Sequence, residues 1–152
     1  MNTQEEKIIS MMKRPIPKKK VSIIRLQMIK ESSTLYGMNH FHGPEGAVNM
    51  VWPMIQYADR EIMLVMSVDN KMLPLAIEIV AVGGLNVLSI DMKDLFKHAI
   101  LNNAAGIVCF HNHPSGDPEV SWEDKKTTKK IQEAGRLLGI PLMDHIVIGE
   151  NK

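Results

Sequence analysis

The chain has 152 residues, of which 45% are hydrophobic and 23% charged, and its formal net charge is +1. This length and apolar content suit a single domain, and a charge so close to zero excludes a protein that binds nucleic acid through its overall charge. Because the sequence has no apolar stretch of about 20 residues, no secretory leader and only one cysteine, Cys109 in an apolar run, we expect a cytoplasmic protein without a membrane partner.

The N-terminal residues differ in composition from the rest of the chain. Residues 1–20 end in clustered lysines and prolines that disfavour regular structure, so we expect a mobile basic arm before a single domain of residues 21–152. Lys18, Lys19 and Lys20 are the residues through which this arm would contact a nucleic acid. No aromatic residue stands among them to stack on bases, however, which favours a solvated tail.

The spacing of apolar residues predicts the first elements of the domain. Residues 21–36 alternate imperfectly and predict one or two strands, whereas residues 44–58 open with Pro-Glu and continue with helical spacing. Pro53 should kink or shorten that helix, because proline lacks the N–H that an inner turn requires. The apolar runs at 62–69 and 73–82 predict two strands, which an Asp-Asn turn joins into a hairpin.

Four further elements follow in the second half of the chain. Helical spacing predicts helices over 92–102 and 121–138, and short apolar runs predict strands over 106–111 and 145–149. We expect His98 to be an exposed residue of the first of these helices. Because the strands are too apolar to face water on either side, the sequence predicts an α/β domain of three α-β-α layers with a central mixed sheet.

The stretch FHNHPSGDPEVSWED, residues 110–124, places three metal-ligand side chains close together. Side chains two apart in an extended segment point to the same face, so His111 and His113 can share one ion. Asp124 follows in the first turn of the helix that opens near Ser121. Two imidazole nitrogens and one carboxylate oxygen suit Zn²⁺ and leave a fourth tetrahedral position open, as in catalytic rather than structural zinc sites.

Each part of this motif also has a simpler explanation. A second His-x-His occurs at His40 and His42, where no carboxylate follows at a similar spacing. Ser121 and Asp124 together fit a helix N-cap with an acid at the third position. The combination of a strand end, a turn and a first-turn acid favours the metal site. We interpret His145, in the last strand, as a residue that supports the site without binding the metal.

The pattern HxHP, then six residues, then SxxD, from His111 to Asp124, resembles the signature of JAMM (MPN+) metallopeptidases. The runs HNHPSGDPEVSWEDKKTT and LMDHIVIG resemble the RadC family in particular, over about residues 21–149. The resemblance implies a JAB/MPN fold of the cytidine-deaminase-like class, a Zn²⁺ cofactor and a protein or peptide substrate. We expect a short form, without the helix-hairpin-helix region of longer RadC proteins or the segment that usually ends the family's sequences.

The resemblance also implies the roles of further residues. In JAMM proteins the general base lies at the start of a strand just after the first helix, which corresponds to Glu61. Glu78, in the next strand, is the alternative. Ser121 would donate a hydrogen bond to the oxyanion of the tetrahedral intermediate.

Three functions remain open at this point. The first is a zinc-dependent hydrolase of peptide or isopeptide bonds, and the second is a DNA-repair-associated protein that binds nucleic acid, with a structural or nucleolytic metal. The third is a metal-binding interaction module without turnover. Glu61 and Ser121 favour the first over the third, because a structural metal site needs neither. The sequence does not indicate the substrate or the oligomeric state.

Overall fold

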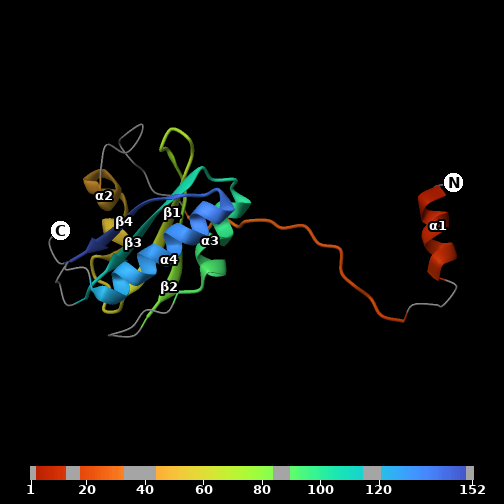
Figure 1. Cartoon of the computed structure of the whole chain (residues 1–152), viewed down its shortest axis with the longest axis horizontal. Coiled ribbons are helices and arrows are strands. Elements are labelled where there is room, and N and C mark those ends of the chain that lie inside the picture. Colours follow the sequence, from red (N-terminus) through yellow and green to blue (C-terminus); the bar gives the residue numbers. More distant parts are fainter. Residues whose placement is uncertain (1–2, 13–17, 33–43, 84–89, 115–120, 150–152) are drawn as a thin grey trace.

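A four-stranded sheet forms the centre of the fold (Figure 1). The computed structural model describes residues 3–12, 18–32, 44–83, 90–114 and 121–149 of the chain. The strands are β1 (Ile62–Val68), β2 (Pro74–Val82), β3 (Gly106–Asn112) and β4 (Leu142–Ile148), in the spatial order β2-β1-β3-β4. β1 pairs antiparallel with β2 and β3, whereas β4 runs parallel to β3. The sheet is therefore mixed, as the sequence predicted.

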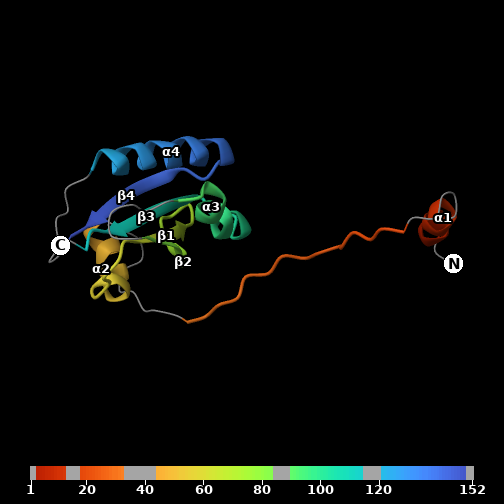
Figure 2. The same cartoon turned by 90° about the horizontal axis from the view of Figure 1, so that it is seen from below.

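Helices cover both faces of this sheet. α2 (Pro44–Ile55) packs on one face, and α3 (Met92–Leu101) and α4 (Trp122–Leu138) pack on the other. Figure 2 shows the sheet between α2 and α4. The predicted three-layer arrangement is confirmed. α2 ends two residues after Pro53, in agreement with the expected shortening of that helix.

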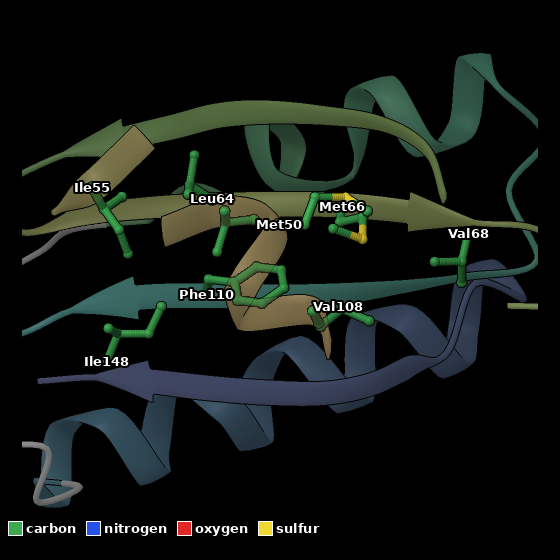
Figure 3. Close-up of a cluster of buried hydrophobic side chains, with 10 residues drawn as sticks. Met50, Ile55, Leu64, Met66, Val68, Val108, Phe110 and Ile148 are labelled. Carbon is green, nitrogen blue, oxygen red and sulfur yellow. The ribbon is translucent and has the colours of Figure 1, made fainter. Parts of the chain in front are cut away.

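The two central strands, β1 and β3, are buried on both faces, which explains why their sequences are continuously apolar. On the α2 face, Leu64, Met66 and Phe110 belong to one buried cluster with Met50 and Ile55 (Figure 3). The alternate residues of the same strands pack against α3 and α4 in a second cluster. The predicted burial of β3 is confirmed.

The expectation that His98 is exposed was wrong. His98 lies on the buried face of α3, where its Nδ1 is 2.9 Å from Glu78 Oε1 and its Nε2 is 2.9 Å from Ser67 Oγ. Asn102 Nδ2 also donates to Ser67 Oγ, at 3.2 Å. A histidine is accommodated under the helix because β1, otherwise apolar, supplies one hydroxyl at this point.

The N-terminal residues also differ from the prediction. Residues 3–12 form a helix, α1 (Thr3–Met12), whose first turn contains Glu5 and Glu6, and acidic side chains there favour a helix N-terminus. Residues 18–32 are exposed and form neither helix nor strand, so the strand predicted over 21–36 is wrong over 21–32. Apolar alternation alone does not make a strand, because a strand also needs a paired neighbour. Residues 33–36 lie outside the described part of the chain.

Two predictions about this region and about location remain untested. Figure 1 shows α1 at the end of the extended segment, away from the sheet, but the mobility of the arm and the domain boundary at residue 21 stay predictions. Within the described residues, the helices are too short or too polar to cross a membrane. The cytoplasmic location is likewise a prediction.

We predict that His98→Ala destabilises the domain by about 2–4 kcal/mol, because it leaves a cavity and removes a partner from the buried Ser67 hydroxyl. Urea unfolding followed by circular dichroism measures this change. Lys97→Ala is the matched control: its side chain is 66% exposed on the same helix, so its effect should stay within about 0.5 kcal/mol. Equal free energies of unfolding for the two variants would contradict a structural role for His98.

Candidate metal centre

The predicted ligands meet where β3 ends and α4 begins. His111 is the sixth residue of β3 and pairs with Met63 of β1, whose side chain belongs to the cluster beneath α3 and α4. Paired residues of neighbouring strands share a face, so His111 points toward the helices, as does His113 two residues later. Asp124 is the third residue of α4, on the same side of the sheet. Local strand and helix geometry thus brings together His113 and Asp124, which are 11 positions apart in the sequence.

The three side chains converge on one point. Nε2 of His111 lies 3.1 Å from Oδ1 of Asp124, and Nε2 of His113 lies 3.1 Å from Oδ2 of the same carboxylate. The two histidine Nε2 atoms are 3.0 Å apart. Ligand atoms of a tetrahedral zinc ion, with bonds of about 2.0–2.1 Å, are roughly 3.3–3.4 Å from one another. The predicted ligand set therefore fits Zn²⁺ in chemistry and in spacing, and its binding of metal stays a prediction.

The electrostatics of the site keep His111 and Asp124 in the protonation states that bind metal. Burial lowers the pKa of His111 to about 4, so its imidazole is neutral near pH 7. Burial alone would raise the pKa of Asp124, but hydrogen bonds from Ser121 and the nearby His111 and His113 outweigh it and hold the pKa below its usual value. A neutral imidazole and an ionised carboxylate are the ligand forms that metal binding requires.

Ser121 is the N-cap of α4 and fixes the Asp124 carboxylate. The Ser121 N–H donates to Asp124 Oδ2 at 2.9 Å, and Ser121 Oγ accepts from the Asp124 N–H at 3.1 Å. The N-cap that the sequence predicted is therefore present as a reciprocal capping box. Because Oγ acts here as an acceptor, this bond does not use the hydroxyl hydrogen, and capping is compatible with donation to a substrate.

Glu61, the predicted general base, lies at the same site. It immediately precedes β1, and one ligand atom each of Glu61, His111 and His113 lie within 4.8 Å of one another. Burial raises the pKa of Glu61; the neighbouring His113 acts against this shift and Asp124 adds to it. The structure thus places two carboxylates beside the histidine pair.

Glu78, the alternative base, is engaged elsewhere. Its Oε1 lies 2.9 Å from His98 Nδ1, in the polar group beneath α3. The contacts of the described residues thus associate Glu61 with the histidine pair and Glu78 with α3.

Asn112 is a residue that the sequence analysis missed. It lies between the two histidines and is buried, 5% exposed. Its Oδ1 accepts from the Ile62 N–H at 2.7 Å, and its Nδ2 donates to the Arg60 carbonyl at 3.0 Å. Both partners flank Glu61, so Asn112 fixes the backbone from which the Glu61 side chain extends. The signal in the sequence was an amide between two histidines, at the end of a strand that is apolar up to Phe110.

His145 contacts the other side of the His111 ring. Its Nε2 is 3.1 Å from His111 Nδ1, and its Nδ1 is 2.6 Å from the hydroxyl of Thr128. Burial lowers the pKa of His145, which favours the neutral ring. This position agrees with the supporting role expected for His145. The contact of His145 with Thr128 was not predicted. His40 and His42 lie outside the described residues.

Comparison with known proteins shows what this chain is similar to. A sequence model of the RadC-like JAB domain matches residues 41–152. A UPF0758 protein of Desulforudis audaxviator is 44% identical over 109 residues, which are 72% of this chain and 47% of that protein. A UPF0758 protein of Listeria monocytogenes is 42% identical over 109 residues, 72% of this chain and 49% of its own length. This chain thus spans about half the length of these relatives.

Proposed function

The chain belongs to the RadC-like JAB domain family, as the runs HNHPSGDPEVSWEDKKTT and LMDHIVIG indicated, and on that premise we propose that it is a zinc-dependent hydrolase of peptide or isopeptide bonds. The observation that carries this proposal is the convergence of His111, His113 and Asp124 to within 3.0–3.1 Å, with Glu61 beside them. A site that only held a metal for structural reasons would need neither a second carboxylate nor a serine at this position.

A bound Zn²⁺ would polarise the scissile carbonyl and lower the pKa of the attacking water. The residues of the chain supply the remaining chemistry. Glu61 accepts a proton from that water and returns it to the leaving amine. Its half-buried carboxylate, with its pKa raised by burial, suits a group that must take up a proton and release it again.

Ser121 would stabilise the charge that develops on the carbonyl oxygen. Its Oγ is held at the helix N-cap by the Asp124 N–H, which leaves the hydroxyl hydrogen to donate to the oxyanion. Because the same helix turn carries Asp124, the donor and the ligand keep a fixed spacing. A protein or peptide substrate would therefore bind across the first turn of α4 and the end of β3.

We predict one zinc ion per chain, bound by His111, His113 and Asp124. His113→Ala should lose the metal, because two protein ligands leave an incomplete site. Elemental analysis of the purified parent and variant measures this directly. His40→Ala and His42→Ala are the controls and should leave the zinc content unchanged. Equal zinc in the parent and in His113→Ala would contradict the ligand assignment.

The role of Glu61 is tested by a nearly isosteric change. After a panel of peptides and isopeptides has identified a substrate whose cleavage a chelator abolishes, Glu61→Gln should reduce turnover by about 10²- to 10⁴-fold while it retains the fold and the zinc. Glu78→Gln should do much less, because Glu78 contacts His98 instead. Rate and bound zinc are measured on the same samples. An active Glu61→Gln together with an inactive Glu78→Gln would move the base to β2.

A second candidate function is contact with nucleic acid through the N-terminal segment. It is supported by Lys18, Lys19 and Lys20, all of which are exposed.

We predict that deletion of residues 1–20 leaves the melting temperature and the zinc content unchanged, because the described side chains of this range are exposed. Loss of DNA binding on deletion, with affinity in the full chain that falls as salt rises, would support this second function. A drop in melting temperature would show that the arm packs on the domain.

A further inference from the structure

A chain of three hydrogen bonds runs from the backbone of α4 to the back of a predicted ligand. The hydroxyl of Thr128 donates to the Asp124 carbonyl at 2.8 Å, and Oγ1 of the same hydroxyl lies 2.6 Å from His145 Nδ1. His145 Nε2 in turn lies 3.1 Å from His111 Nδ1. The side chains of Thr128, His145 and His111 are buried or half-buried, so water competes little for these hydrogen bonds.

The Asp124 carbonyl, at one end of this series of hydrogen bonds, determines which atom donates in each of the others. A carbonyl oxygen only accepts, so the single hydroxyl hydrogen of Thr128 is used on Asp124. Thr128 Oγ1 must then accept from His145, which places the proton of the neutral His145 ring on Nδ1. His145 Nε2 is left with a lone pair, and it accepts from His111 Nδ1–H. The proton of His111 is therefore on Nδ1, and its Nε2 carries a lone pair.

That lone pair points into the proposed metal centre. His111 Nε2 faces Asp124 Oδ1 at 3.1 Å and His113 Nε2 at 3.0 Å. A lone pair directed at a carboxylate is unfavourable unless a cation lies between them. The direction of the hydrogen-bond chain is thus the one that a cation at this point requires.

We propose that Thr128 and His145 are positioning residues that hold His111 in the tautomer and ring orientation that bind the metal. Neither residue touches the metal. Each acts through the next, and the Asp124 carbonyl is the final acceptor. The inference rests on the metal centre proposed above, and it adds two residues, on α4 and β4, to those that determine metal affinity.

The experiment compares the parent chain with four variants in two matched pairs and with one control variant. Thr128→Val keeps the shape but removes the acceptor, whereas Thr128→Ser keeps the hydroxyl. His145→Leu removes the acceptor that His111 requires, whereas His145→Gln can offer an amide oxygen in its place. Thr127→Val, one residue away on α4 and outside the hydrogen-bond chain, controls for loss of a threonine from this helix.

Zinc affinity, measured by competition with a chromophoric chelator, should fall about 10- to 100-fold in Thr128→Val and His145→Leu. Thr128→Ser and Thr127→Val should bind like the parent, and His145→Gln should lie between. In the zinc-loaded parent, ¹⁵N spectra of the histidine rings should show His145 protonated on Nδ1 and His111 protonated on Nδ1. Circular dichroism and melting temperature confirm that each variant is folded.

Each outcome bears on the inference. The positioning role is overturned if a folded Thr128→Val binds zinc like the parent. It is also overturned if the His145 ring of the zinc-loaded parent is protonated on Nε2. The hydrolase proposal stands in both cases. Weak zinc binding in Thr128→Val that is restored in Thr128→Ser supports the positioning role. A protein that cleaves no substrate would count against the hydrolase proposal alone. A parent chain that binds no zinc overturns both.

Discussion

The register of β3 between β1 and β4 is the constraint on which the site depends. His111 is opposite Met63 in β1 and opposite Val147 in β4. A shift of one residue in either pairing would turn the histidines toward α2 and the apolar residues toward the site. The packing of β3 opposes such a shift, because a slip of one residue would put either the polar His111 or the much smaller Cys109 in the buried place of Phe110.

The capping of α4 is the second determinant, and it couples helix stability to ligand geometry. Asp124 accepts the Ser121 N–H, as an acid at the third helical position does in any capping box, and the same carboxylate faces both histidines. The structural and the functional interpretations of this serine and aspartate are therefore not alternatives. A carboxylate fixed by the backbone needs little reorganisation to bind a cation, which lowers the entropic cost of metal binding.

How well the sequence predicted each feature depends on how far apart in the sequence the interacting residues lie. The strands of the sheet, the helices α2 to α4 and the convergence of the three candidate ligands depend on spacing within one segment, and they were predicted within a few residues of their observed bounds. In the N-terminal segment, by contrast, α1 was not predicted and the strand expected over 21–32 does not form. The buried polar contacts that were missed depend on partners far along the chain: His98 on Ser67, and Asn112 on the backbone at Arg60 and Ile62. Nothing in the local sequence distinguishes a buried, hydrogen-bonded histidine on α3 from an exposed one.

The tripeptide His111-Asn112-His113, at the end of β3, carries two candidate ligands and also fixes the backbone next to Glu61. Because side chains alternate, His111 and His113 point to the helices of one layer while Asn112 points to the other. Asn112 there bonds the residues on either side of Glu61, so the base candidate is attached to the strand that carries the ligands. The distance between Glu61 and the histidine pair is then set by the pairing of β1 with β3 rather than by a flexible loop. This arrangement would give the positional accuracy that the proposed proton transfer between Glu61 and a reacting water requires.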